Sequence, residues 1–214
     1  MSLLNISDEQ ALAWVQWWVS GARVADSSWC LGDAPVRPEL WAWLQRHPSA
    51  GLDRYVGLTA TLPPTPQANL LPLLRLNTAQ WSRVLNLVVQ VCAGNDPLRE
   101  TDLDAADLIW CRRLGRALQP GRWLPAQWPG SAAHVQGLRL LRAWVGEPVW
   151  QRLRLHFDRR RIEDAECVAF DNLPASRLEA LWQAVAWYAI TLFAEGPPHA
   201  DPSQPDPQST SGSA

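Results

Sequence analysis

The sequence predicts an all-α fold, and three observations support that prediction. Apolar residues recur at helical spacing through most of the chain, and several of these segments open with a helix-capping residue. The third observation is that no two neighbouring segments offer a clear pair of alternating strands. We expect an irregular helical domain of six or seven helices over residues 1–195, in which residues 1–60 can form a smaller N-terminal lobe.

The first helix is expected to begin after Ser7, because Ser7 and Gln10 have the spacing of a capping box. Behind this cap an apolar stripe recurs at helical spacing, which we expect to face the core, with Trp14 and Trp18 beside it. The stripe consists of Leu12, Val15, Val19 and Ala22.

A short helix, a proline-rich loop and a long helix follow. The short helix should begin at Pro38 and end before Pro48, since the residue that precedes a proline disfavours helical geometry. Residues 57–72 are expected to form a loop. Thr78 is expected to cap the long helix, and Gly94 to end it. The apolar residues of the two helices are Leu40, Trp41 and Leu44, then Trp81, Leu85, Val88 and Cys92.

Two more helices are predicted, the first from Thr101 to Pro120 and the second from Ser131 to Gly146. The first has acidic residues in its opening turns and arginines in its last turns, a polarity that complements the helix dipole. Its expected buried face is Leu103, Ala106, Trp110, Leu114 and Leu118. That of the second is Val135, Leu138, Leu141 and Val145.

The segment 148–157 is ambiguous, because its apolar residues fit a helix and also a short strand near 150–157; the helix is favoured for lack of a strand partner. Residues 158–166 are interpreted as a solvated connection. The last helix is expected to begin at Pro174 and to bury one face. Residues 196–214 have almost nothing to bury and predict a disordered tail. The expected buried face of the last helix is Leu178, Leu181, Trp182, Val185, Ala189 and Leu192.

Composition narrows the function classes. The formal net charge is −2, which gives no electrostatic reason to expect nucleic acid as a partner. All 19 basic residues are arginines, a usage that indicates a bacterial genome rich in G and C. The four cysteines form no C-x-x-C pair, which fits a reducing compartment. No segment resembles a signal peptide or a membrane span, so we expect a cytoplasmic protein without a transmembrane segment.

The sequence contains no recognisable catalytic, metal-binding or cofactor-binding motif. Its four histidines lack metal-ligand spacing, and neither a phosphate-binding glycine loop nor a hydrolase nucleophile elbow is present. Asp102, Asp104 and Asp107 are explained by their place at a helix N-terminus. We therefore predict a protein that is not an enzyme and that has no catalytic residue, metal or cofactor.

The fourteen tryptophans favour a protein-binding role over an enzymatic one, because tryptophan buries a large area in contacts but does no acid–base or nucleophilic chemistry. Trp123 and Trp128 lie in a loop with three prolines, where they can anchor a partner or fold back over the core. The run Arg159, Arg160 and Arg161 offers a second, basic surface. These five residues are the predicted partner-binding residues. Trp17 and Trp43 lie off their helix stripes and are further candidates for exposure, whereas the tryptophans expected to pack in the core are Trp81, Trp110 and Trp182.

Residues 62–188 resemble the SctK family (YscK, PscK, OrgA and MxiK) of the bacterial type III secretion sorting platform. The resemblance lies in the order of segments: the Pro- and Leu-rich stretch 62–71, a leucine-rich helical region, and a helix that ends in the Trp-Pro loop 122–129. A further helix, the segment 149–155 and a helical end follow.

The resemblance implies a non-enzymatic adaptor that acts at the cytoplasmic face of the inner membrane. Its partners would be the cytoplasmic domain of an SctD-like ring protein and an SctQ-like pod protein. Another interaction module, such as a secretion chaperone or regulator, is the alternative. An enzyme or small-molecule binder with a site built from dispersed residues is a third reading.

Overall fold

The computed structural model describes residues 6–31, 37–47, 50–93, 102–125, 133–168, 170 and 172–194. These parts of the chain hold nine α-helices and five short 3-10 helices and no strand, which confirms the predicted all-α class. The count exceeds the six or seven helices expected. The two helices that the sequence analysis did not predict are α3 (Ala50–Tyr55) and α8 (Arg159–Glu166).

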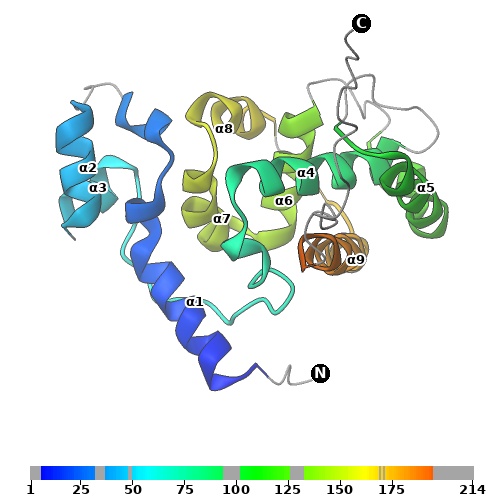
Figure 1. The fold of residues 1–214 in the computed structure, drawn as a ribbon, viewed down its shortest axis with the longest axis horizontal. Helices are drawn as coiled ribbons and strands as arrows, with labels where there is room; N and C mark the ends of the chain where they lie inside the picture. The colour runs from blue at the N-terminus through cyan, green and yellow to red at the C-terminus, as the bar shows by residue number, and fades with distance from the viewer. Residues whose placement is uncertain are drawn as a thin grey trace, which may run out of the picture.

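The centre of the fold is the helix α4 (Thr78–Ala93), which packs against α6 (Ala133–Val145), α5 (Ala105–Leu118) and α9 (Ala175–Ala194) (Figure 1). Every α4 side chain from 84 to 92 is buried. This stretch buries side chains on every side, Asn86 and Gln90 included, because α4 is enclosed by three other helices.

Glycines allow these helices to approach closely. A Cβ at Gly115 in α5 would lie 2.8 Å from the backbone oxygen of Val91, and a Cβ at Gly137 in α6 would lie 3.0 Å from the Cβ of Leu85. Helix backbones can come this near only where a residue has no side chain. The positions of α5 and α6 against α4 are therefore determined by single residues.

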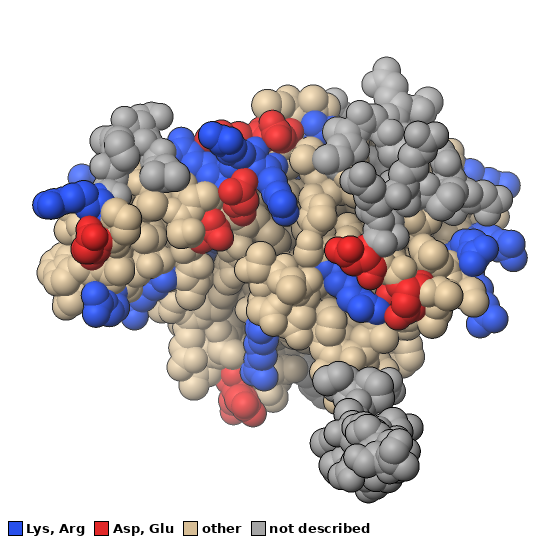
Figure 2. Space-filling model, turned by 45° about the horizontal axis from the view of Figure 1, so that its top comes forward, with Lys and Arg blue, Asp and Glu red and all other residues tan. Residues whose placement is uncertain are grey.

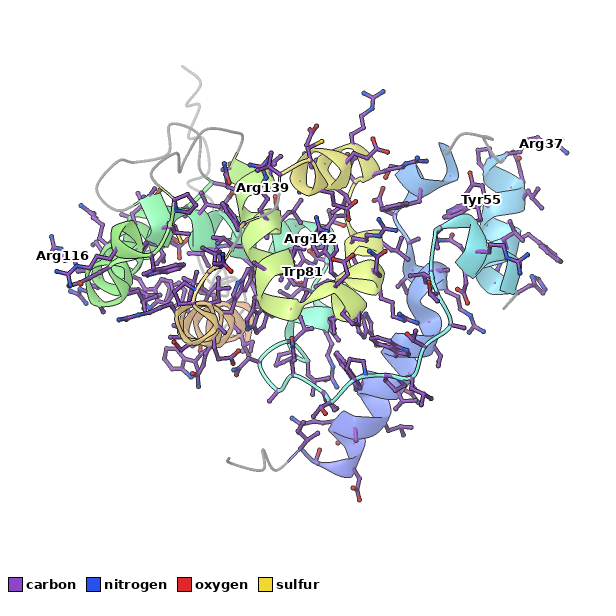
Figure 3. All side chains as sticks on the ribbon, turned by 180° about the vertical axis from the view of Figure 1, so that it is seen from behind. Arg37, Tyr55, Trp81, Arg116, Arg139 and Arg142 are labelled. Atoms are coloured by element: carbon purple, nitrogen blue, oxygen red, sulfur yellow. The ribbon has the colours of Figure 1, made fainter. Side chains whose placement is uncertain are left out.

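The remaining helices lie around this centre. α7 (Glu147–Leu153) follows α6 directly, and α8 packs on the outer side of α6. α2 (Pro38–Arg46) and α3 lie at the opposite end of the molecule from α5, and α1 (Asp8–Ser20) projects as an arm (Figure 1). Figure 3 shows the same arrangement from behind, with Trp81 near the middle and Arg37 and Arg116 at the two ends.

The capping box of α1 is confirmed, since Ser7 Oγ accepts from the backbone N–H of Gln10 and the Gln10 side chain accepts from Ser7 N–H. The predicted stripe is wrong. Leu12, Val15 and Val19 are exposed, and only Ala22 of the stripe is buried.

Trp14 and Trp18 are the buried residues of α1 instead, at 1% and 3% exposure. Their indole N–H groups donate to the backbone oxygens of Pro64 and Thr61, each at 2.9 Å. An indole buries more area than Leu or Val, and its N–H needs an acceptor when buried. The proline-rich segment supplies those acceptors, so the helix turns its tryptophans inward.

The start of α5 also differs from the prediction. Residues 102–104 are not helical, and the cap is Asp104, whose carboxylate accepts from the N–H of Asp107. The buried positions are Asp107, Cys111, Gly115 and Leu118, whereas Ala106 is exposed and Trp110 and Leu114 are half-buried. Asp107 is buried because Arg83 pairs with it, and this rotates the helix face.

Several other predictions are confirmed. The segment 148–157 is helical, as α7 followed by the 3-10 turn Arg154–His156. The predicted inward residues of α4, α6 and α9 are buried, apart from the half-buried Leu192. The cap of α4 is Asn77 rather than Thr78, because Asn77 and Gln80 exchange side-chain-to-backbone hydrogen bonds.

The segment 158–166 is not a solvated connection, as the sequence had suggested, but the helix α8. Asp158 caps it by accepting from the N–H of Arg161, and Ile162 and Ala165 are buried against α6. Two apolar residues three apart are enough to bury one face of so short a helix. Thr101, Gly94, Ser131, Trp128 and the tail 196–214 lie outside the described residues.

Candidate partner-docking surface

Two neighbouring grooves lie along α9. The first, which we call the α5–α9 groove, has a volume of about 480 Å³. Its rims are formed by Trp110 of α5 and Trp187 of α9, and small side chains line its floor. No charged residue lines it. The lining residues are Ala68, Asn69, Pro72, Trp110, Leu114, Ala180, Gln183, Ala184, Ala186, Trp187 and Ile190.

Trp187 is the most exposed aromatic residue of the described chain, at 67%. This exposure follows from the register of α9: Val185, Ala186 and Ala189 face the core, which leaves Trp187 on the opposite side of the helix. Tryptophan is enriched among the residues that contribute most of the binding energy in protein interfaces, so an exposed tryptophan beside an apolar groove is a candidate anchor.

The opposite rim is held in place by a buried polar network. Trp110 stacks on Tyr188, with ring centres 4.1 Å apart. The Tyr188 hydroxyl donates to Asp107 at 3.0 Å, and the Arg83 guanidinium donates to the same carboxylate at 2.6 Å. Burial and the hydrogen bond to Asp107 raise the pKa of Tyr188 to about 12. The tyrosine therefore stays a neutral donor, and Trp110 has a fixed platform.

The second groove, the α1–α9 groove, lies between α1 and the C-terminal end of α9 and has a volume of about 970 Å³. It shares Pro72 and Ile190 with the α5–α9 groove, so the two grooves are adjacent. The residues that line it from α1 include Ala13, Gln16 and Trp17.

One histidine lines the second groove. The Trp17 indole N–H donates to Nε2 of His156 at 3.2 Å. Burial lowers the pKa of His156 to about 4, so the imidazole is neutral at pH 7 and its Nε2 can accept. The predicted exposure of Trp17 is therefore only partly right, since this indole is half-buried and hydrogen-bonded. Trp43 is exposed as predicted, at 49%.

A serine and a histidine meet on another side of the molecule. Ser82 Oγ of α4 forms a hydrogen bond with Nε2 of His134 of α6, beside a cavity of about 200 Å³. Burial and the neighbouring Arg161 lower the pKa of His134. A serine inside a helix has neighbouring backbone N–H groups already engaged in the helix, so they cannot form an oxyanion hole. The pair links α4 to α6.

Trp123, one of the predicted partner-binding residues, is half-buried. Its indole N–H donates to the backbone oxygen of Leu118 at 3.1 Å, and its ring packs against the core at the end of α5. This is the fold-back that the sequence analysis left open as an alternative. Trp128, the second aromatic of that loop, lies outside the described residues.

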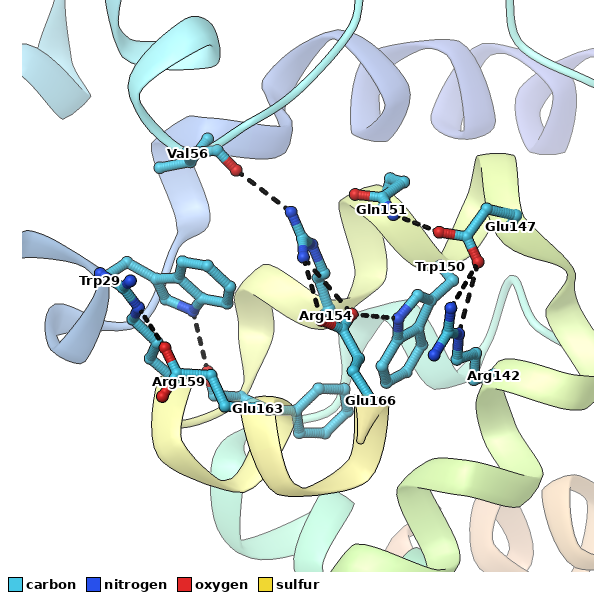
Figure 4. Close-up of polar contacts among 11 residues, drawn as sticks. Trp29, Val56, Arg142, Glu147, Trp150, Gln151, Arg154, Arg159, Glu163 and Glu166 are labelled. Carbon is cyan, nitrogen blue, oxygen red and sulfur yellow. Dashed lines mark hydrogen bonds and ion pairs between the residues drawn. The ribbon is translucent and has the colours of Figure 1, made fainter. Parts of the chain in front are cut away.

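The three predicted arginines lie on α8, whereas Trp123 follows the 3-10 turn Pro120–Arg122 beyond α5. Arg159 pairs with Glu163 at 2.8 Å (Figure 4). Arg160 and Arg161 are exposed. Figure 2 shows basic and acidic side chains next to one another on this face, rather than a patch of one sign.

Glu166 gives α8 a rigid base. Its carboxylate accepts from the Trp150 indole at 2.7 Å and from the Arg154 guanidinium at 3.3 Å (Figure 4). Arg154 also donates to the backbone oxygen of Val56, which ties α8 to the N-terminal part of the chain. Arg160 and Arg161 therefore project from a well-supported helix.

No family model, curated protein or solved structure matched this chain. Two other observations bear on function. None of the helices in the described ranges has both the length and the apolar character needed to cross a bilayer. Nor do the described residues contain a group of three His, Cys, Asp or Glu placed to hold a metal ion.

Sequence reasoning missed the rims of the α5–α9 groove. Trp110 was placed on a buried face, and Trp187 was not singled out. A signal for Trp187 exists, because the stripe Leu178, Leu181, Trp182, Val185 and Ala189 leaves it on the opposite side of the helix. No comparable signal exists for Trp110, because its position depends on the burial of Asp107.

Proposed function

We propose that this protein is a non-enzymatic adaptor of SctK type in a bacterial type III secretion sorting platform. It would link the cytoplasmic domain of an SctD-like inner-membrane ring protein to an SctQ-like pod protein, at the cytoplasmic face of the inner membrane. The observation that carries the adaptor part of this proposal is the uncharged α5–α9 groove with the exposed Trp187 on its rim. The family part rests on the resemblance of residues 62–188.

The α5–α9 groove suits an apolar segment of a partner protein. Its alanine floor leaves room for larger side chains, and Trp110 and Trp187 can pack against both sides of an inserted helix or strand. Gln183 offers a polar contact at the edge. A groove without charge favours a partner segment whose contact face is also uncharged, because a buried unpaired charge is costly.

The exposed pair Arg160 and Arg161 on α8 offers a second and different surface. Arginine forms bidentate hydrogen bonds with carboxylates, so this surface suits an acidic partner. Two unlike surfaces on separate helices are what a protein that joins two partners needs.

Binding measurements with both purified components test this proposal. Trp187→Ala should weaken one partner roughly thirtyfold, since an anchor tryptophan is typically worth about 2 kcal/mol. Trp43→Ala is the matched control, because Trp43 is also exposed but lies on α2. If the parent protein binds neither component, the family assignment fails.

The exposed arginine pair on α8 is tested by Arg160→Gln combined with Arg161→Gln. We expect this double variant to weaken the other partner, and more strongly at low salt than at high salt. Arg112→Gln with Arg113→Gln is the control, because that pair is exposed on α5. If both double variants lose the same affinity, the partner responds to the net charge of the protein and not to this surface.

The Trp-Pro loop is the competing location for the apolar contact. Trp123→Ala with Trp128→Ala should leave binding intact if the α5–α9 groove is the docking site. Because Trp123 packs on the core, the double variant is first checked for cooperative unfolding. If the double variant is folded but loses binding, and Trp187→Ala still binds, the apolar contact lies in the loop and not in the groove.

A further inference from the structure

Another hollow of the described residues is lined by two side chains that each hold a buried polar atom without a hydrogen-bond partner. This hollow, which we call the α4 cavity, has a volume of about 310 Å³ and lies between α4, Asp102 and Phe193 of α9. Arg83 and Asn86 line it from α4. Because these two residues are three apart in the sequence, their side chains are neighbours on one side of the helix.

The two unpartnered atoms are Nε of Arg83 and Oδ1 of Asn86. Neither has a hydrogen-bond partner in the part of the chain that the structure describes. Asn86 is only 3% exposed. A buried donor or acceptor without a partner destabilises the folded state, so native proteins contain few of them. Here one atom is a donor and the other an acceptor, and both belong to residues that line the same cavity.

Two other polar side chains of the α4 cavity are already engaged. Ser82 is hydrogen-bonded to His134, and the Gln80 side chain accepts from the backbone N–H of Asn77 at 2.9 Å. The Asp102 carboxylate differs, because it is exposed and forms no ion pair with another described residue. The cavity therefore combines a donor, an acceptor and a carboxylate that can each take a partner.

We propose that the α4 cavity binds one residue of an extended segment of a partner protein. An extended residue presents its backbone N–H and its C=O on the same side. The C=O accepts from Arg83 Nε, and the N–H donates to Asn86 Oδ1, so each atom gains the partner that it lacks. The side chain of the bound residue is apolar and packs on Phe193, and a neighbouring basic residue pairs with Asp102.

The size of the cavity argues against a single ordered water as the occupant. One water can bridge a donor and an acceptor, but it takes up only about 30 Å³, roughly a tenth of this volume. The Phe193 ring also suits an apolar group better than water. This inference does not rest on the proposed adaptor function, because the α4 cavity shares no described lining residue with the α5–α9 groove and includes neither Arg160 nor Arg161.

A peptide titration followed by NMR tests the main-chain contact. The probe is the capped peptide acetyl-Ala-Leu-Arg-Ala-amide. In the full chain it should shift the side-chain amide signal of Asn86 and the Nε–H signal of Arg83, with a dissociation constant on the order of a millimolar. The matched control carries N-methyl leucine, which keeps the side chain but cannot donate from the backbone. It should bind roughly tenfold less tightly.

Asn86→Leu separates binding from folding. The melting temperature of the free protein should stay the same or rise, because an unpartnered buried oxygen is removed, whereas the probe should bind at least tenfold less tightly. Gln67→Leu is the matched control. Its Oε1 is also buried without a partner, but Gln67 does not line the α4 cavity, so this variant should bind the probe as the parent does.

A change of charge in the probe tests the role of Asp102. The peptide acetyl-Ala-Leu-Glu-Ala-amide should bind several-fold less tightly than the arginine peptide at low salt, and Asp102→Asn should remove this difference. Asp164→Asn is the control, because Asp164 is an exposed carboxylate on α8, and it should keep the difference.

The proposal is overturned if neither the Asn86 nor the Arg83 signal of the parent responds to several millimolar probe. Water alone then occupies the cavity. Equal binding of the N-methyl peptide also overturns it, since the backbone N–H would play no part. If Asn86→Leu lowers the melting temperature and still binds the probe, Asn86 has only a structural role and the proposal fails.

Discussion

The Arg152 guanidinium lies over the Trp18 ring, with its Cζ 3.6 Å from the ring centre. Its Nε donates to the backbone oxygen of Trp18, and its Nη2 donates to the backbone oxygen of Thr59, each at 3.1 Å. Arg152 is only 6% exposed. One side chain of α7 thus holds α1 and the start of the proline-rich segment together, which positions both the α1–α9 groove and the exposed stripe of α1.

Arg152→Met should lower the free energy of unfolding by roughly 2–4 kcal/mol, because the cation–π contact is lost and two carbonyl groups lose their donors. Methionine keeps most of the apolar stem, so the loss reports on the guanidinium. Urea unfolding measures it. Arg142→Met is the control: Arg142 pairs at the surface with Glu147, and its replacement should change stability by less than about 1 kcal/mol. Similar losses in the two variants would contradict the role of Arg152.

The close approach of α5 to α4 makes a second prediction. Gly115→Ala should destabilise the protein by about 1–3 kcal/mol although alanine favours helix, because its Cβ would lie 2.8 Å from the backbone oxygen of Val91. Gly121→Ala is the control, since a Cβ there meets nothing within 4 Å. Thermal unfolding compares the two. A stabilised Gly115→Ala variant would mean that α5 can move away at little cost.

The sequence predicted the helices of the core well, because their apolar residues recur regularly. α4, α6 and α9 bury the faces expected of them, and the helical choice for 148–157 is right. In these segments burial of aliphatic and aromatic side chains dominates, and helical spacing alone identifies the inner face.

The predictions failed where buried polar groups or large aromatic side chains determine which side of a helix faces the core. On α1 the tryptophans displace Leu12, Val15 and Val19, since the indoles find acceptors in a loop about fifty residues later. On α5 the pairing of Asp107 with Arg83 rotates the helix. Neither partner can be read from local spacing, because each contact joins segments distant in the chain. The groove along α9 could not be predicted for the same reason.

The buried carboxylate behind the α5–α9 groove makes a third prediction. Asp107→Asn should lower the free energy of unfolding by about 2 kcal/mol. Breaking a fully buried ion pair typically costs roughly 3–5 kcal/mol, and the loss should be smaller here because Arg83 is partly exposed to water. Asp104→Asn is the control: it pairs with the same Arg83 but is exposed, and asparagine also caps helices well. A double-mutant cycle with Tyr188→Phe should give a coupling of about 1 kcal/mol. Additive effects would show that Tyr188 does not depend on Asp107.

Acidification should destabilise the protein through His156. The pKa of this imidazole is about 4 in the folded chain against 6.5 as its ordinary value, because burial disfavours the charged form. Between these values the unfolded chain binds the additional proton, so stability is constant above about pH 6.5 and falls as the pH drops toward 4.

At pH 5 we expect a loss of about 1–2 kcal/mol relative to pH 7.5 from His156 alone. His156→Gln should remove this share, since the glutamine oxygen can still accept from the Trp17 indole but does not titrate. The pKa of His134 is also lowered, so part of the pH dependence remains in the variant. Urea unfolding at both pH values measures the difference, with His47→Gln as control, because His47 is exposed on Trp43. If His156→Gln keeps the full pH dependence of the parent, folding does not lower the pKa of His156 and the pH dependence has another source.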